Sequence, residues 1–225
     1  NAVKIYSEKK AHELILLDIF ATKNKSKINI DLIKKIRDEI FIPLCVGGGI
    51  KNIKDVSDLI ESGVEKVSLN SILDENINLI SEISNKYGSQ SVLVSLDIYN
   101  KKDEIILIQN NKKKTFKLLE FKNYLKILEN AGAGEILITR IDNEGTQNGF
   151  DIEFFKKLNN LISIPIIANG GAKNLADFEN LFDKTEICAA VGGACFVYYG
   201  ARKAVLINYP KENDLEILMS KYENA

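Results

Sequence analysis

Two similar glycine-rich segments constrain the fold of this chain more than any other feature. IPLCVGGGIKN at 42–52 and IPIIANGGAKN at 164–174 share Ile-Pro, Gly-Gly and Lys-Asn at matching positions, 122 residues apart. The same offset aligns Glu13 with Glu135, each at the start of an apolar run. A duplicated set of β/α units that closes on itself predicts an α/β fold, a (β/α)8 TIM barrel built from two half-barrels.

The apolar run at 91–98 has no partner in the first half, because subtracting 122 places its mate before residue 1. We therefore expect the first barrel strand to be missing from this chain, which begins at Asn1 and not at Met. An open Rossmann-like sheet fits less well, since it needs no second glycine loop and the sequence has no GxGxxG fingerprint.

Apolar runs alternate with amphipathic segments along the chain. We expect strands near 14–20, 43–47, 66–70, 91–98, 135–141, 165–169 and 186–191. We expect helices near 31–40, 53–62, 77–87, 119–131, 152–161 and 175–182. The strand candidates are mostly continuous apolar runs, as in parallel sheets covered on both faces. Residues 103–117 predict a hairpin inserted into a single domain that spans 1–225.

Composition excludes several classes of protein. The 225 residues include 30 Lys and Arg against 31 Asp and Glu, so no basic surface for nucleic acid is expected. Apolar runs fall short of the roughly 18 residues of a membrane span, so no membrane partner is expected. Three cysteines in apolar surroundings are typical of a reducing, cytoplasmic location without disulfides.

Glycine loops follow three of the expected strands, at Gly47–Gly49, Gly170–Gly171 and Gly192–Gly193. Loops at the carboxyl ends of barrel strands build the functional site, and their backbone N–H groups bind anions. We expect two anion sites on opposite sides of the barrel mouth, suited to a ligand with a phosphate or other anionic group at each end. The alternative is that these glycines only permit tight turns.

Asp18 ends the LILLD run and is the candidate catalytic carboxylate, as a general base or as a ligand for a substrate hydroxyl. The alternative role is an N-cap or a turn residue. The single histidine, His12, precedes this strand at the opposite face, so no Ser–His or Cys–His pair and no metal site is expected. We expect no cofactor.

Charged residues begin several strands at the amino-terminal end of the barrel: Glu13, Glu65, Lys66 and Glu135. Apolar residues would be easier to bury there. The charges form either a salt-bridge layer that plugs the barrel or a polar gate to an axial passage.

The motifs LLDIFATK, FIPLCVGGGIKN, EKVSLNS, YGSQSVLVSLD, GAGEILITRIDNEGTQNGFD and IPIIANGGAKN resemble those of the HisF family, the cyclase subunits of imidazole glycerol phosphate synthase. The resemblance implies an ammonia-dependent, lyase-type synthase subunit with a HisH-type glutaminase docked at the amino-terminal face. Ammonia would travel along the barrel axis, through a gate of Glu13, Lys66 and Glu135, to a phosphorylated small molecule. The implied phosphate and substrate positions are Gly48, Gly49, Asn70, Ser71, Glu144, Gly145, Thr146, Asn169, Gly170, Gly171 and Gly193.

The sequence also departs from the family it resembles. The resemblance places the first catalytic aspartate of the family on the strand that we expect to be missing. It places the second at Asn123, whose amide cannot transfer protons at neutral pH, and a phosphate-loop serine at Ala194. The tail FVYYGARKAVLINYP resembles HisF-like proteins of surface-glycan and flagellin-sugar pathways. Those work with a HisH-like glutaminase and an ATP-using partner to convert an N-acetyl group of an activated sugar into an acetamidino group, which is the function we favour.

Two alternatives stay open. One is a true histidine-pathway cyclase in which Glu120 or Asp97 replaces the lost acid. The other is a non-catalytic scaffold that binds the glutaminase and regulates it.

Overall fold

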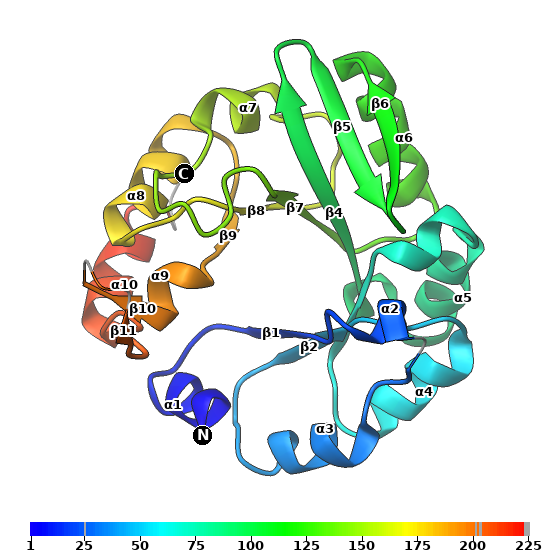
Figure 1. Ribbon diagram of the computed structural model, residues 1–225, viewed down its shortest axis with the longest axis horizontal. Helices are drawn as coiled ribbons and strands as arrows, with labels where there is room; N and C mark the ends of the chain where they lie inside the picture. Colours follow the sequence, from blue (N-terminus) through cyan, green and yellow to red (C-terminus); the bar gives the residue numbers. More distant parts are fainter. Residues whose placement is uncertain (25, 201, 203, 223–225) are drawn as a thin grey trace.

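A curled parallel sheet forms the centre of the molecule (Figure 1). The computed structural model describes residues 1–24, 26–200, 202 and 204–222. The parallel strands follow the order β1-β2-β3-β4-β7-β8-β9, so β1 and β9 are the two ends of the sheet. Their bounds are β1 Leu14–Leu17, β2 Leu44–Gly47, β3 Lys66–Leu69, β4 Val92–Lys101, β7 Glu135–Arg140, β8 Ile166–Asn169 and β9 Ala189–Val191. The predicted α/β fold with parallel strands is confirmed, and its sheet is barrel-like.

Helices cover the outside of this sheet (Figure 1). They are α3 Ile30–Arg37, α4 Ile53–Glu61, α5 Asn78–Tyr87, α6 Leu118–Asn130, α7 Ile152–Lys157 and α8 Leu175–Lys184. Each helix turns apolar side chains toward the strands, as Val56 and Leu59 do in α4, and this layer is the main core. Helix α7 ends earlier than predicted, and the chain turns soon after it at Asn160, which has a φ of 56°.

The internal repeat extends to individual hydrogen bonds. Strands β2 and β8 have bounds exactly one repeat length of 122 residues apart. Asn52 and Asn174 precede α4 and α8 with nearly the same backbone angles, φ −155° and −153°. Asp55 accepts from the N–H of Lys51, as Asp177 accepts from that of Lys173. The two halves therefore fold the same glycine-loop-to-helix connection in the same way.

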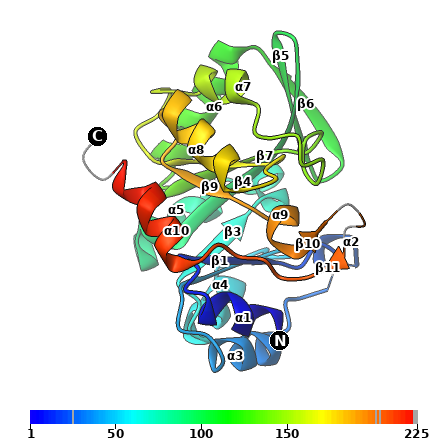
Figure 2. The ribbon, with the colours of Figure 1, turned by 90° about the vertical axis from the view of Figure 1, so that its left-hand side faces the viewer.

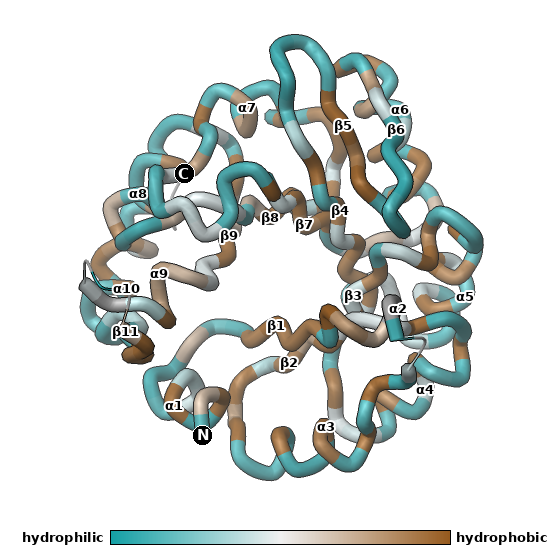
Figure 3. The backbone as a smooth tube through the Cα atoms, viewed as in Figure 1, coloured by the Kyte–Doolittle hydropathy of each residue, from teal (hydrophilic) through white to brown (hydrophobic). Residues whose placement is uncertain are grey.

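The predicted hairpin begins earlier than expected. β4 continues to Lys101 and pairs antiparallel with β5 (Glu104–Gln109), which pairs with β6 (Lys112–Phe116). The extension of β4 is polar, so its apolar run did not reveal it. Figure 3 shows that β5 is the apolar strand of this hairpin and β6 the hydrophilic one. β5 packs inward through Ile105 and Leu107.

The carboxyl-terminal segment returns to the amino-terminal helix α1 (Ala2–Glu8) (Figure 2). The rings of Tyr6 and Tyr209 meet edge to face with 6.0 Å between centroids, and Lys10 pairs with Glu212. The remaining short elements are α2 Ala21–Asn24, η1 Ser71–Asp74, η2 Ser89–Ser91, α9 Ala194–Val197, β10 Tyr198–Tyr199, β11 Ala204–Val205 and α10 Glu212–Ser220. None of the helices in the described residues has the length and hydropathy needed to cross a bilayer.

Candidate functional site

An ion cluster occupies the amino-terminal end of the sheet interior. The Lys66 ammonium at the start of β3 lies 2.8 Å from a Glu13 carboxylate oxygen and 2.8 Å from one of Glu135. Burial alone would lower the pKa of Lys66, but hydrogen bonds to the two glutamates outweigh it and leave the pKa raised. Lysine therefore stays charged and holds both carboxylates together.

Glu65, the fourth charge expected in this ring, lies outside it. Its carboxylate accepts from the N–H of Leu44 and pairs with Arg37. Adjacent strand residues point to opposite faces of a sheet, so Glu65 and Lys66 cannot both point inward.

An apolar belt lies above the ion cluster. Its buried members are Cys45, Leu93, Leu137 and Ile167, which come from four different strands. Burial raises the pKa of the Cys45 thiol, which is therefore an uncharged core group, as one expects of an apolar interior.

Polar side chains resume above the belt, at the carboxyl-terminal half of the interior. The Ser68 and Ser95 hydroxyls share a hydrogen bond of 2.7 Å, and both residues are buried. Thr139 accepts a hydrogen bond from the Asn169 amide, 3.2 Å away. Belt residues Leu93 and Leu137 precede Ser95 and Thr139 by two positions, so these polar groups line the same inner face.

Asp97 is the carboxylate that reaches the mouth from this face. It follows Ser95 by two positions and accepts a hydrogen bond of 2.9 Å from the Asn70 amide nitrogen. Burial raises the pKa of Asp97, and the hydrogen bond from Asn70 only partly opposes this effect. The Asn70 amide oxygen is buried without a hydrogen-bond partner among the described residues. A ligand N–H or O–H would satisfy it.

Two predicted catalytic positions lie elsewhere. Asp18 is exposed, and one of its carboxylate oxygens accepts from the N–H groups of Phe20 and Ala21, as in a cap or turn residue, so its catalytic role stays a prediction. Asn123 is exposed on α6, and Figure 1 shows this helix outside the parallel strands. Asp97 ends the apolar run SVLVSLD, just as Asp18 ends LILLD. This similarity is the sequence feature that indicates Asp97 as a carboxylate at the mouth.

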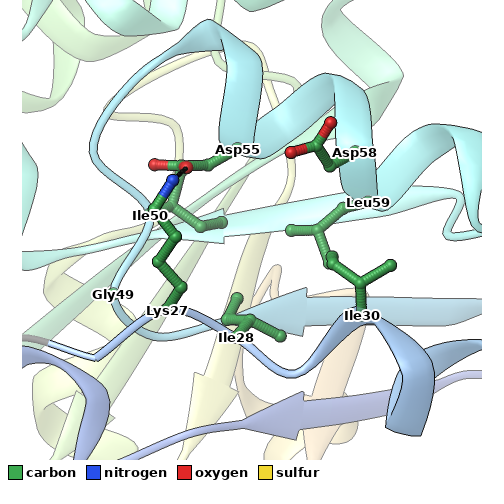
Figure 4. Close-up of a pocket in the computed structure, with 8 residues that line it drawn as sticks. All are labelled: Lys27, Ile28, Ile30, Gly49, Ile50, Asp55, Asp58 and Leu59. Carbon is green, nitrogen blue, oxygen red and sulfur yellow. Dashed lines mark hydrogen bonds and ion pairs between the residues drawn. The ribbon is translucent and has the colours of Figure 1, made fainter.

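The first glycine loop contains Gly48 and Gly49 after β2, close to Asn70 and Ser71 at the end of β3. A small pocket lies behind this loop, between the segment 27–30 and α4 (Figure 4). Its charged lining consists of Asp55, Asp58 and Lys27, and Lys27 is paired with Asp55. Asp58 is paired with Lys54, so both carboxylates at this pocket are neutralised by lysines.

A second, shallow pocket lies at the carboxyl ends of β8 and β9. It is lined by Glu144, Gly145, Asn169, Gly170, Gly171, Ala172, Val191, Gly192, Gly193 and Ala194. The structure thus brings together most residues predicted for the second anion site. Thr146 is not among them, because its hydroxyl donates to Asn143 within the loop. Burial raises the pKa of Glu144, whose carboxylate lies beside Gly193.

Comparison with known proteins gives the family. A sequence profile described as "Histidine biosynthesis protein" matches residues 1–202. The chain is 41% identical over 222 residues to the "Putative imidazole glycerol phosphate synthase subunit HisF" of Leptospira borgpetersenii, covering 97% of this chain and 86% of that protein. It is 38% identical over 218 residues to the "Putative imidazole glycerol phosphate synthase subunit hisF2" of Pseudomonas aeruginosa (96% and 86%). It is 36% identical over 217 residues to the imidazole glycerol phosphate synthase subunit HisF of Hydrogenobaculum sp. (96% and 86%).

Proposed function

Because this chain belongs to the histidine biosynthesis protein family, as a HisF-type subunit similar to those of imidazole glycerol phosphate synthase, we propose that it is the ammonia-using subunit of a glutamine amidotransferase complex. It receives ammonia at the amino-terminal end of the barrel and supports its incorporation into a phosphorylated substrate at the mouth.

The observation that carries this proposal is the order of side chains along the barrel interior. A charged cluster around Lys66 lies at one end, and the buried Ser68–Ser95 pair and the Asn70–Asp97 pair lie toward the other. The apolar belt between them excludes the charged ammonium ion, because burying an unpaired charge is costly, and the hydroxyl and amide groups above it provide hydrogen bonds for uncharged ammonia. At the mouth, Asp97 meets the reactants as an acid or base.

The partner at the amino-terminal face is a HisH-type glutaminase. The face carries the Lys66 cluster that would control entry of ammonia, and it exposes Phe41, whose side chain is 95% exposed just before β2. A large apolar side chain in such a position is typical of an interface anchor.

We further propose that the substrate is an activated sugar and that an ATP-using partner completes its conversion to an acetamidino sugar. Ala194 supports a function in sugar modification. It lines the second pocket at the position where the resemblance to histidine-pathway cyclases implies a serine hydroxyl. The Pseudomonas aeruginosa relative has the numbered name hisF2. Such a number fits a second HisF-type subunit in addition to the HisF subunit of histidine biosynthesis. Asn123 gives no support, since it lies outside the barrel.

A comparison of substrates tests this proposal. The purified protein is supplied with ammonium and either the ribulosyl intermediate of histidine biosynthesis or an activated N-acetyl sugar, the latter with the ATP-using partner. Ammonia-dependent amidination of the sugar, without cyclase turnover, supports the sugar branch. Turnover of the ribulosyl intermediate at ordinary cyclase rates contradicts it.

The true histidine-pathway cyclase is the second candidate function, and one observation favours it. Asp97 places a carboxylate with a raised pKa at the mouth, so an acid–base group is available. Growth of a cyclase-deficient strain that expresses this protein would support the cyclase, and loss of that growth in an Asp97→Asn variant would identify Asp97 as the acid–base group.

A further inference from the structure

A buried arginine fixes the loop that forms one wall of the second pocket. The Arg140 side chain, 7% exposed, ends β7 on the outer face of the sheet. Its Nε and Nη2 donate to the two carboxylate oxygens of Asp142 at 3.1 and 3.0 Å. Its Nη1 donates to Asp151, and its guanidinium lies 5.1 Å from the centre of the Phe154 ring. Asp142 and Asp151 are the two ends of the loop that carries Glu144 and Gly145.

The main chain of Arg140 contacts both walls of the same pocket. Its carbonyl oxygen accepts the N–H groups of Asn143 and Glu144. The same oxygen lies against Gly170, where an added Cβ would come within 2.7 Å of it. Asn143 in turn donates to the carbonyl of Gly149, 2.7 Å away. Movement of Arg140 would therefore move the loop 142–151 and the glycine turn after β8 together.

The repeat provides an independent reason to assign a positioning role to this residue. Arg140 corresponds to Asp18 at the offset of 122. The main-chain carbonyl of Arg140 lies against Gly170, and that of Asp18 lies against Gly48. Each of these glycines is the first residue with positive φ in its turn. Asp18 holds its own loop by accepting from Phe20. Both halves thus use the residue at this position to fix the adjoining loop.

Arginine suits the longer loop for two reasons. Its planar guanidinium forms a two-point contact with one carboxylate and still reaches a second, which lysine cannot do. Its charge also offsets those of Asp142 and Asp151, which would otherwise add to that of Glu144 and repel an anion.

We propose that Arg140 is the positioning residue of the second anion site, which holds the loop 142–151 in the geometry that binds a phosphate group of the substrate. This inference rests on the proposed function in that it takes the pocket to bind phosphate. Arg140 acts through the loop and does not touch the anion.

Titration with inorganic phosphate, followed by amide resonances of the protein, tests this proposal. Gly145 and Gly193 report the second site, and Gly48 and Gly49 report the first site in the same sample. Arg140→Lys should weaken phosphate binding at the second site about tenfold and leave the first site unchanged. An Arg37→Lys variant is the matched control, because Arg37 forms its ion pair with Glu65 at the opposite end of the barrel.

A second variant guards against a general loss of folding. Asp151→Asn removes the carboxylate that Arg140 contacts, but asparagine still caps α7 in its place. It should also weaken the second site selectively, and hydrogen exchange of 143–149 should quicken in both variants without a change at 47–52. Phosphate affinity equal to that of the unmodified protein in both variants overturns the role of Arg140 while leaving the proposed function intact. No phosphate-induced shift in either glycine set of the unmodified protein overturns the anion sites themselves.

Discussion

The glycines of the second pocket divide into those required by the fold and those available to a ligand, and alanine substitution separates the two. Gly171 has a φ of 101°, and a Cβ added there would lie 2.1 Å from the carbonyl oxygen of Gly149. Gly145 has a φ of 73°, but an added Cβ would meet nothing within 4 Å. A left-handed conformation costs alanine about 1–2 kcal/mol at either position. Overpacking against the main chain adds about 1–3 kcal/mol at Gly171 alone.

Gly171→Ala should therefore lower the free energy of unfolding by about 2–5 kcal/mol, and Gly145→Ala by about 1–2 kcal/mol. Urea unfolding measured by circular dichroism gives both values. Gly145→Ala should weaken phosphate binding in spite of its smaller effect on stability, because its Cβ would project into open space beside the pocket. Equal losses of stability in the two variants would refute this division of the glycines.

Three further substitutions give separate checks. Asp97→Asn should reduce turnover about 10²–10⁴-fold. Burial raises the pKa of Asp97, so ionisation of this carboxyl costs the folded protein stability as the pH rises. Asparagine does not ionise, and the Asp97→Asn variant should therefore have the larger free energy of unfolding at neutral pH. That difference should disappear in acid below the ordinary aspartate pKa of about 3.9, and urea unfolding at both pH values measures it. Phe41→Asp should weaken glutaminase binding at least about tenfold by calorimetry, whereas Leu119→Asp, at an exposed residue of α6, should not. Asn52→Ala should destabilise the protein by about 1 kcal/mol through loss of the cap on α4, measured by urea unfolding.

Much of the architecture was predictable because the repeat imposes strong constraints. Two glycine loops at one spacing gave the order of strands and helices, and the hydrogen bonds of Asp55 and Asp177 follow the same spacing. The polar extension of β4 was not predictable, since its residues pair only with the hairpin and show no apolar run. Element ends also shifted by a few residues, as expected when local turns decide them.

The candidate site was predictable in part. Once the strands are known, their geometry fixes which face the charged side chains around Lys66 occupy and at which end of the strands the glycine loops lie. The ion cluster and the second pocket therefore consist of the expected residues. The contacts of Asp18 depend on a local turn, in which its short carboxylate accepts from nearby backbone N–H groups. The apolar pattern of a strand does not show whether the carboxylate forms such local bonds or points into the mouth. The position of Asn123 was taken from a family resemblance and not from a strand face, so its role stays a prediction.

The proposed function depends on passage of ammonia through the barrel, and a substitution of Lys66 at the entrance tests that passage. In a reconstituted complex with the glutaminase, product formation by a Lys66→Met variant is measured once with glutamine and once with ammonium salts, beside the Arg37→Lys control. Methionine leaves the carboxylates of Glu13 and Glu135 unpaired at the entrance. The ratio of product formed to glutamine hydrolysed should fall in Lys66→Met while the ammonium-dependent rate is kept. An unchanged ratio, with the glutaminase still bound, would contradict passage of ammonia through the barrel.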